Sequence, residues 1–259
     1  MCDINNKELK NLTDKQQDLL IVEGIKLFTE AVKSNLKVKS VYIDKVNLTS
    51  LSRIFPKYNS YDLSFISNDL LAELYTTAAR PEREDLLIAV LERPTWKISD
   101  LFSSGKDLVF LEQIQDPGNM GVVIRSSAAF DIGGILISKN SVSPFNSKVV
   151  RSSAGAVFHI PIVVVDKTNN FFQLSRKNKY KMIATSASAK DSLIDLSFNN
   201  KAVYMFGNEG SGLTKEVLKL SDNVVRIPHK KEIESLNLSV SVSLILWERY
   251  RRGKTVDGR

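Results

Sequence analysis

Cysteine, histidine, glycine and proline are all scarce in this chain. Its 259 residues include one cysteine, two histidines, 12 glycines and 7 prolines. One cysteine cannot form an internal disulfide bond or a thiolate metal cluster, so nothing indicates an oxidising compartment. The low glycine and proline content excludes collagen-like and low-complexity sequence, and the apolar share of 43% is that of an ordinary globular protein.

Long hydrophobic runs are missing as well. No stretch approaches the ~18 consecutive apolar residues of a membrane span, and the segment from Met1 to Lys10 is polar, unlike a signal peptide. We therefore expect a cytoplasmic protein. His159 and His229 have no acidic or thiol cluster at ligand spacing, so the sequence predicts no metal site.

The positive charge is distributed unevenly along the chain. The formal net charge is +7, yet residues 1–97 hold 14 Lys and Arg against 14 Asp and Glu. Residues 98–259 hold the other 22 basic and 15 acidic residues. Contacts with nucleic-acid phosphate are therefore expected from the second part of the chain.

Apolar runs of strand length alternate with helical patterns in both parts of the chain, which predicts two mainly parallel α/β sheets. The segment from Arg93 to Lys106 breaks this pattern, so we place a linker at 98–106 between domains at 1–97 and 107–259. The predicted strands are Lys39–Ile43, Leu63–Ile66, Leu86–Leu91, Leu108–Ile114, Gly134–Ser138, Pro161–Val165, Lys181–Ala184, Ala202–Phe206 and Val224–Ile227.

The first informative motif runs from Gln115 to Arg125. It follows a predicted strand, turns at a Pro-Gly pair and opens a helix, with Asn119 placed to cap free backbone N–H groups. Arg125 falls in the second turn of this otherwise apolar helix. An ordinary strand-turn-helix junction with a solvated arginine would give the same pattern, so the motif alone does not decide its function.

The second motif, from Tyr204 to Thr214, has three glycines in six residues after a buried strand. Such a loop turns sharply or lets a ligand approach the backbone closely. A phosphate-binding loop is disfavoured, because Leu213 stands where its lysine belongs and Glu209 would place a carboxylate in the phosphate cradle. The loop better suits a ligand with a cationic or hydroxyl-bearing part, and a plain tight turn stays open.

The third motif runs from Ile227 to Val242. Apolar and polar residues alternate strictly over Leu236–Leu244, which favours a strand. Leu236, Val240, Leu244 and Trp247 also satisfy helical spacing, so the residues alone leave both interpretations open, with the strand favoured.

Together the three motifs resemble those of the SpoU family of RNA ribose 2′-O-methyltransferases in the SPOUT superfamily. The matching elements are Asn119-x-Gly121-x-x-x-Arg125, then Gly207-Asn208-Glu209-Gly210-x-Gly212-Leu213, then Ile227-Pro228 followed by Glu234-Ser235-Leu236-Asn237-x-Ser239-Val240. Arg151 to Ala156 also resembles the family. More weakly, the N-terminal part resembles its small α/β RNA substrate-binding domain, through Ile21–Gly24 opening a helix, Val38–Ile43 as a strand, and Ser67–Leu71 with Thr76 and Thr77 further on.

The resemblance implies a trefoil-knotted α/β catalytic domain that forms a homodimer through helices including the last one, and hence a helix rather than a strand over Leu236–Leu244. It implies methyl transfer from S-adenosylmethionine to a ribose 2′-hydroxyl of structured RNA, ribosomal rather than transfer RNA. The implied catalytic residues are Arg125, Asn119, Glu209, Ser235 and Asn237. The implied cofactor-binding residues are Thr185, Gly207, Asn208, Glu209, Ile227, Pro228, Ser235, Leu236 and Asn237.

Guanidinium stays protonated at neutral pH, so Arg125 is expected to stabilise the developing alkoxide while a phosphate or water takes the proton. His229 and Lys231 depart from the family pattern of an apolar residue and a glycine. We expect RNA contacts from Arg151, Arg176, Lys177, Lys230 and Lys231. The alternatives are a non-catalytic RNA-binding or assembly protein on the same scaffold, and a nucleotide-phosphate enzyme using the glycine loop.

Overall fold

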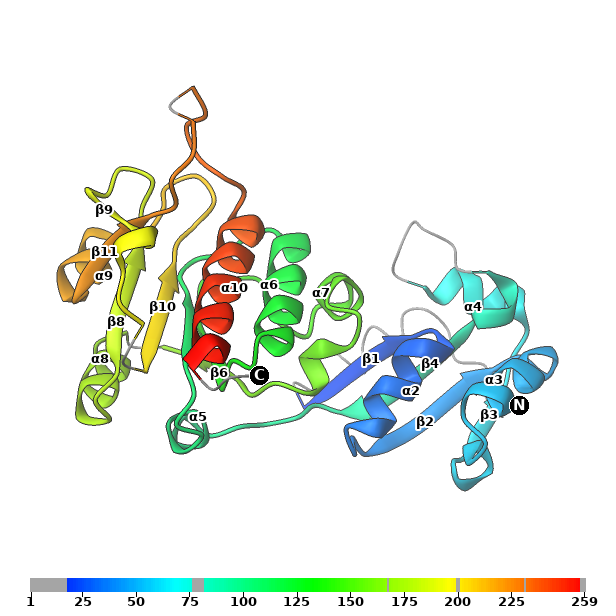
Figure 1. Cartoon of the computed structure of the whole chain (residues 1–259). Coiled ribbons are helices and arrows are strands. Elements are labelled where there is room, and N and C mark those ends of the chain that lie inside the picture. Colours follow the sequence, from blue (N-terminus) through cyan, green and yellow to red (C-terminus); the bar gives the residue numbers. More distant parts are fainter. Residues whose placement is uncertain (1–17, 76–81, 167, 199–200, 231, 257–259) are drawn as a thin grey trace. The chain divides into compact units, whose positions relative to one another are not determined.

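The computed structural model describes residues 18–75, 82–166, 168–198, 201–230 and 232–256. They form two compact units that meet in the chain at Pro94 and Thr95 (Figure 1). Within the described ranges, no helix combines the length and apolar character needed to cross a membrane.

The segment predicted as a linker, 98–106, is part of the second unit. It contains the helix α5 (Ile98–Ser103), whose first turn is closed by Asp100 accepting a hydrogen bond from the backbone N–H of Lys97 at 2.9 Å. Leu101 of this helix is fully buried in the core of the second unit. Of the residues that suggested a linker, Ser103 is the last of α5, and Ser104 and Gly105 follow in the turn to the next strand.

The first unit has a four-stranded sheet in the order β1-β4-β2-β3. Only β2 and β3 pair in parallel, while β4 runs antiparallel to both β1 and β2, so the prediction of a mainly parallel sheet is wrong here. Its elements are β1 (Leu19–Glu23), α2 (Ile25–Lys33), β2 (Val38–Ile43), α3 (Leu48–Ile54), β3 (Leu63–Phe65), α4 (Asn68–Leu74) and β4 (Leu87–Glu92).

The start of the first unit also differs from the prediction. Ile21 to Glu23 lie in the strand β1 rather than at the opening of a helix, and Gly24 follows as the N-cap of α2 with a φ of 97°. A glycine accommodates this backbone conformation, which allows the chain to turn directly from strand to helix. Thr76 and Thr77, which follow α4, lie outside the described residues.

The second unit has a seven-stranded sheet in the order β7-β6-β5-β10-β8-β11-β9, and every pair of neighbours is parallel as predicted. The two-residue strand β9 was not predicted. The strands are β5 (Leu108–Leu111), β6 (Gly134–Ser138), β7 (Ile162–Val165), β8 (Lys181–Thr185), β9 (Asp191–Ser192), β10 (Ala202–Phe206) and β11 (Asn223–Arg226). The further helices are α6 (Pro117–Ala129), α7 (Ser147–Ser152), α8 (Thr168–Lys177), α9 (Lys215–Leu220) and α10 (Leu238–Val256).

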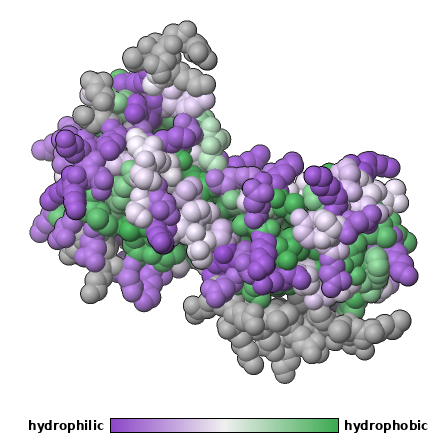
Figure 2. Space-filling model, turned by 90° about the horizontal axis from the view of Figure 1, so that it is seen from below, coloured by the Kyte–Doolittle hydropathy of each residue, from purple (hydrophilic) through white to green (hydrophobic). Residues whose placement is uncertain are grey.

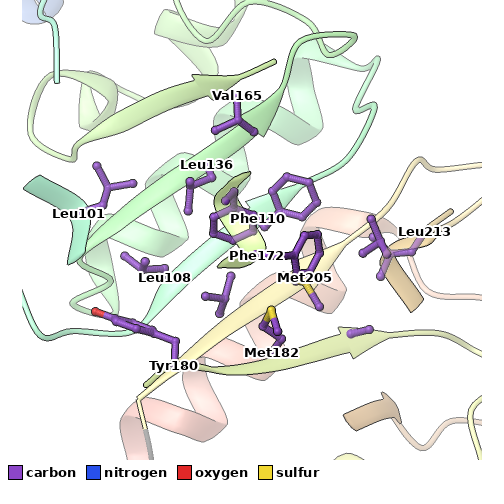
Figure 3. Packing of buried hydrophobic residues seen from close by; sticks show 14 of the residues in the cluster. Leu101, Leu108, Phe110, Leu136, Val165, Phe172, Tyr180, Met182, Met205 and Leu213 are labelled. Carbon is purple, nitrogen blue, oxygen red and sulfur yellow. The ribbon is translucent and has the colours of Figure 1, made fainter. Parts of the chain in front are cut away.

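The main core of this unit lies between one face of the sheet and the helices α5, α8 and α9 (Figure 3). Phe110 of β5 stacks on Phe171 of α8 with ring centroids 5.2 Å apart, and Met182 and Met205 fill the neighbouring positions on β8 and β10. Burial of such side chains contributes about 1.5–3 kcal/mol each. This packing fixes the sheet whose loops carry the three motifs.

The helices α6 and α10 pack against each other beside the sheet (Figure 1). Ser126 and Ser243 link them through their hydroxyl groups, 2.8 Å apart. The helix α10 begins at Leu238, so it confirms from that residue on the helical interpretation that the family resemblance gave for Leu236–Leu244, and the strand favoured by alternation is wrong. The trefoil knot stays a prediction.

A partly buried ion pair joins the second half of α10 to the residue before β5. Arg249 Nε donates to Asp107 Oδ2 at 2.6 Å, while Asp107 Oδ1 accepts from the backbone N–H of Ala202 at 2.7 Å. Burial, with the Asp107 carboxylate nearby, raises the pKa of Tyr204 well above its ordinary range, so this phenol stays neutral. Asp107 thus connects β5, β10 and α10.

Replacing Asp107 with alanine is expected to lower the free energy of unfolding by about 3 kcal/mol, because Arg249 and the Ala202 N–H lose their partner inside the protein. The matched control is Asp166→Ala, which breaks an exposed pair with Lys139 and should cost less than about 1 kcal/mol. Urea unfolding of both variants measures the difference. Equal losses would show that the Asp107 pair is no more important than a surface pair.

Candidate active site

The polar residues of all three motifs lie at the carboxyl ends of β5, β8, β10 and β11. In parallel α/β sheets ligands bind at this edge, where connections leave in opposite directions. A pocket of about 710 Å³, here called the glycine-loop pocket, is lined by residues after β8, β10 and β11, including Thr185, Gly207 and Ile227. A second pocket of about 550 Å³, the amide pocket, adjoins it and is lined by residues including Gln115, Asn119 and Asn237. Both pockets contain Glu209 and Ser235.

The glycine loop after β10 is a closed, pre-formed turn. Asn208 and Gly212 exchange backbone hydrogen bonds of 3.1 and 2.9 Å across it. The Asn208 side chain accepts from the N–H groups of Gly210 and Ser211 and donates to the Gln113 carbonyl at 2.9 Å. Gly212 has a φ of 69°, which glycine adopts without strain. The loop therefore keeps its shape without a ligand.

A chain of side-chain hydrogen bonds connects the three motifs. Asn237 Nδ2 donates to Asn119 Oδ1 at 3.1 Å, and Asn119 Nδ2 donates to Glu209 Oε1 at 3.2 Å. Glu209 also accepts from the backbone N–H groups of Gln115 and Asp116 at 3.4 and 3.3 Å. The two amides are thus oriented by a carboxylate that is itself exposed at the mouth of both pockets.

Two details of the first and third motifs differ from the prediction. The N-cap of α6 is Asp116, whose Oδ1 accepts from the Gly118 N–H at 2.7 Å, so Asn119 does not cap the helix. Asn237 caps α10 instead, because its Oδ1 accepts from Ser239 N at 2.8 Å. Asn119 is therefore a residue within α6 and Asn237 is the N-cap of α10, and a hydrogen bond between their side chains holds the two amides in place.

Most residues predicted for a cofactor line the glycine-loop pocket. Thr185, whose hydroxyl donates to the Met205 carbonyl at 3.0 Å, holds β8 against β10 at the pocket wall. Pro228 is exposed and lines neither pocket, and Asn237 lines only the amide pocket. Seven of the nine predicted residues line the glycine-loop pocket, namely Thr185, Gly207, Asn208, Glu209, Ile227, Ser235 and Leu236.

Arg125 is not brought to either pocket within one chain. It is exposed on α6, six residues after Asn119, which places it about 9 Å further along the helix axis and on a different face. Its neighbour one turn earlier, Val122, is also exposed. The predicted catalytic set is therefore assembled in one chain only for Asn119, Glu209, Ser235 and Asn237.

The residues predicted to contact RNA fall into two separate groups. Arg151, at the end of α7, and Lys230 are exposed near the loops of the pockets, since Ser152 bonds the Pro117 carbonyl at 3.1 Å and His229 lines the glycine-loop pocket. Arg176 and Lys177 are the last residues of α8, which ends just before β8 begins, so they lie at the amino ends of the strands, opposite the pockets. Lys231 lies outside the described residues.

The sequence reasoning missed several pocket residues. His229 was noted only as a departure from the family, yet its Nδ1 lies 2.7 Å from the Ile227 carbonyl and its Nε2 lies 3.1 Å from the Ile233 carbonyl. The histidine thus holds the loop after β11 beside the pocket. The polar run from Ser186 to Ser188, which follows β8 directly, could have been found from its place after a predicted parallel strand.

Replacing Glu209 with glutamine is expected to slow catalysis about 10- to 100-fold, because an amide cannot accept all three hydrogen bonds that the carboxylate accepts. Glu216→Gln, an exposed position in the first turn of α9, is the matched control and should leave turnover unchanged. Steady-state rates of the two variants provide the measurement. A Glu209→Gln rate equal to that of the control would show that the Glu209 carboxylate has no role in catalysis.

Grouped metal ligands are not found at this site. In the ranges that the structure covers, no three His, Cys, Asp or Glu side chains are placed so that they could hold a metal ion.

Comparison with known proteins shows the family. The model of the SpoU rRNA Methylase family matches residues 107–247, which is more than half of the chain. The parallel α/β unit that carries the glycine loop and the amide pocket is thus a methyltransferase domain of this family. The chain belongs to the SpoU rRNA methylase family and is an RNA methyltransferase.

Individual relatives are similar over nearly the whole chain. An uncharacterized tRNA/rRNA methyltransferase of Synechocystis is 29% identical over 92% of this chain and 86% of its own length. The 23S rRNA (guanosine-2'-O-)-methyltransferase RlmB of Xanthomonas campestris is 28% identical over 94% and 92%. The structure of the SpoU methyltransferase AviRb from Streptomyces viridochromogenes, in complex with AdoMet, has a TM-score of 0.83 at 23% identity and covers 94% of this chain and 93% of that one. This last likeness shows the fold.

Proposed function

We propose that the protein transfers a methyl group from S-adenosylmethionine to a ribose 2′-hydroxyl of structured ribosomal RNA in the cytoplasm. The observation that carries this proposal is the hydrogen-bonded chain from Asn237 through Asn119 to Glu209, which unites three family motifs around adjoining pockets. The named RlmB relative, which spans both units of this chain, supports a ribosomal substrate. A neighbour described for 2'-OH methylation of tRNA covers only 60% of this chain.

The glycine-loop pocket fits S-adenosylmethionine. Phe206, Leu213 and Ile227 provide apolar contact area for an adenine ring, while Glu209 and Glu234 place carboxylates where a cationic ligand group gains from them. The pocket has room for a molecule of this size, and Gly207 keeps its wall free of a side chain. When bound, the cofactor supplies an electrophilic methyl group.

The residues of this chain position the ribose and stabilise charge. Asn119, Asn237 and Ser235 offer amide and hydroxyl groups at the amide pocket, and Glu209 holds the amides in one orientation. Arg125 stabilises the alkoxide that develops at the 2′-oxygen, and water or an RNA phosphate accepts the proton. Correct orientation of the hydroxyl itself lowers the activation free energy by roughly several kcal/mol.

A homodimer explains how Arg125 reaches a pocket. Val122, Val240, Leu244 and Trp247 are exposed to 39%, 47%, 42% and 48% on α6 and α10, a large apolar area for a water-exposed face. Arg125 lies one turn after Val122, and Ser241, beside Val240, lines the glycine-loop pocket. A second copy packed symmetrically on this face would bring its Arg125 towards the partner's pocket.

The N-terminal unit is proposed to select the RNA by shape and hydrogen bonding, since residues 1–97 carry no net charge. Arg151, Lys230 and Lys231 are proposed to hold RNA phosphate beside the pockets. Arg176 and Lys177 would contact RNA elsewhere on the same unit, because they lie at the opposite edge of its sheet.

Titration calorimetry with S-adenosylmethionine and with ATP, each with and without ribosomal RNA, tests this proposal. We expect binding of S-adenosylmethionine and none of ATP, because the glycine loop has Leu213 in place of a phosphate-binding lysine. Binding of ATP alone would support a nucleotide-phosphate enzyme. RNA binding without any affinity for S-adenosylmethionine would indicate a non-catalytic RNA-binding protein.

A further inference from the structure

A third pocket, here called the β9 pocket, borders the glycine-loop pocket and lies nearer the amino ends of β8 and β11. It has a volume of about 390 Å³, and its walls include Lys181, Ile183, Lys190, Ser192, Ser197 and Asn223. Val225 lines both this pocket and the glycine-loop pocket, so the two are neighbours along β11. Neither the catalytic chain of hydrogen bonds nor the cofactor proposal uses it.

The outer wall of the β9 pocket is firmly held. The strand β9 pairs with β11, and the Ser192 hydroxyl accepts from Ile194 N at 3.1 Å. From α10, Arg252 donates to the carbonyls of Ile194 and Leu196 at 3.1 Å each and is itself bonded to Glu248 at 2.6 Å. A wall fixed at both ends gives a pre-formed hollow, which binds a ligand without the cost of ordering a loop.

The pocket opens beside a basic edge of the sheet. This edge consists of exposed or half-buried cations that form no ion pair with any described residue, namely Arg176, Lys177, Lys179, Lys181 and Lys201. They are held together by the backbone, since Lys181 N donates to Lys201 O at 3.0 Å and Lys179 N donates to Arg176 O at 2.9 Å. Seen from below, the surface on the side of α8 is strongly hydrophilic (Figure 2).

We propose that the β9 pocket binds a nucleotide of the substrate RNA other than the one methylated, while the basic edge holds the phosphates that follow. This inference rests on the proposed function for its ligand. Ile183, Leu196 and Val225 form an apolar floor for a base, Ser197 and Asn223 can hydrogen-bond to it, and Lys181 and Lys190 attract phosphate. Asp191 and Asp195 can accept hydrogen bonds from ribose hydroxyls, and their charge disfavours a free polyphosphate nucleotide.

The β9 pocket shares no lining residue with the amide pocket, where the methylated ribose is proposed to bind. Lys181 and Thr185 stand at opposite ends of β8, which separates the amino end of this strand from the glycine-loop pocket by about 13 Å. A stacked strand rises about 3.4 Å per nucleotide, so roughly four nucleotides span that distance. The enzyme would then require RNA on one side of the target as well as the target itself.

Filter binding of protein-free bacterial 23S ribosomal RNA to the full chain tests this inference. Lys181→Gln combined with Lys190→Gln should weaken binding and reduce the slope of log K against log salt by about 1.5, because two phosphate contacts are lost. Lys26→Gln combined with Lys57→Gln, on the first unit, removes the same charge and should leave the slope unchanged. Ser197→Trp fills the pocket without changing charge and should weaken RNA binding about tenfold or more.

S-adenosylmethionine affinity, measured on each variant, completes the test. It should equal the wild-type value throughout, which also shows that the variants are folded. If Ser197→Trp lowered cofactor affinity, the β9 pocket would belong to the cofactor site and the inference would be overturned. Unchanged RNA affinity and slope in both pocket variants would overturn it too. Failure of the proposed function is separable, since it would appear as no cofactor binding by the wild-type protein.

Discussion

Gly207→Ala is expected to weaken S-adenosylmethionine binding severely. A Cβ atom at position 207 would overlap the backbone of Gly212 and Leu213 on the other side of the glycine loop. Backbone cannot swing away as a flexible side chain can, so the exchange of hydrogen bonds between Asn208 and Gly212 would break. The loop would open into the glycine-loop pocket, and we expect affinity to fall by about 100-fold or more, equivalent to about 3 kcal/mol.

Gly210→Ala is the matched control in the same loop. A Cβ there would meet only Asn208 Oδ1 at 3.5 Å, which is ordinary contact. Its melting temperature should match the wild type, and its cofactor affinity should fall far less than that of Gly207→Ala in titration calorimetry. If both variants bound the cofactor equally well, the closed loop would not be what forms the pocket.

Arg125→Ala is expected to reduce methyl transfer by about 100- to 1000-fold, the usual cost of losing one group that stabilises developing negative charge. Cofactor affinity should change little, because the proposed role of Arg125 is to stabilise the 2′-oxygen of the RNA and not to hold the cofactor. Arg125→Lys keeps the charge but not the planar fork of donors, and we expect it to lose most of the turnover as well. Single-turnover rates at saturating cofactor measure both variants, and a near wild-type rate for Arg125→Ala would refute its role.

Mixing variants tests whether Arg125 acts across a dimer. A preparation of Arg125→Ala and Gly207→Ala subunits, dissociated and reassembled together, contains heterodimers with one intact pocket facing one intact arginine. Random pairing then restores about a quarter of the wild-type rate. If Arg125 acted on the pocket of its own chain, every site would keep one defect and no activity would return.

The last helix shows where periodicity alone gives the wrong structure. Over Leu236–Leu244 every second residue is apolar, which satisfies a strand, but the same residues also satisfy helical spacing. In the structure Val242, Ile245 and Leu246 are buried while Val240 and Leu244 are exposed. A helix explains this pattern only if its solvent-exposed face also carries apolar residues. The proposed homodimer would cover that face.

The first sheet shows a second limit. Alternation of strands and helices predicts parallel pairing, yet β1 and β2 each pair antiparallel with β4. The central strand β4 is buried over Leu87–Leu91, as parallel strands usually are. Both faces of β4 are buried because the strand is central in the sheet. A continuous apolar run in the sequence therefore does not reveal whether a strand pairs parallel or antiparallel.

The candidate site was predictable in its residue types but not in its geometry. Glycine and asparagine after a buried strand indicated a tight loop, and the family resemblance connected Asn119, Glu209 and Asn237. The sequence could not show that Asp116 rather than Asn119 caps α6, since both side chains can accept from helix N–H groups. Nor could it show that Arg125 points away from the pockets, because that depends on the packing of α6 against α10.

The net charge of +7 also divides differently in three dimensions. The excess positive charge lies in residues 98–259, but the cations are found at both ends of the parallel strands. Lys230 lies near the glycine-loop pocket at the carboxyl ends, and Arg176 lies before the start of β8 at the amino ends. The distribution of charge along the sequence does not distinguish these two groups of cations, because both lie in residues 98–259 and only the fold places them at opposite ends of the strands. RNA bound at both would extend along the whole length of β8.

The most direct test of the central claim is a map of 2′-O-methylated nucleotides in total RNA from cells with and without this protein. The account predicts that one or a few ribose methyl groups disappear from ribosomal RNA when the protein is absent, and that the purified protein with S-adenosylmethionine restores them. An unchanged ribose methylation map, or the loss of a base methyl group in its place, would contradict it.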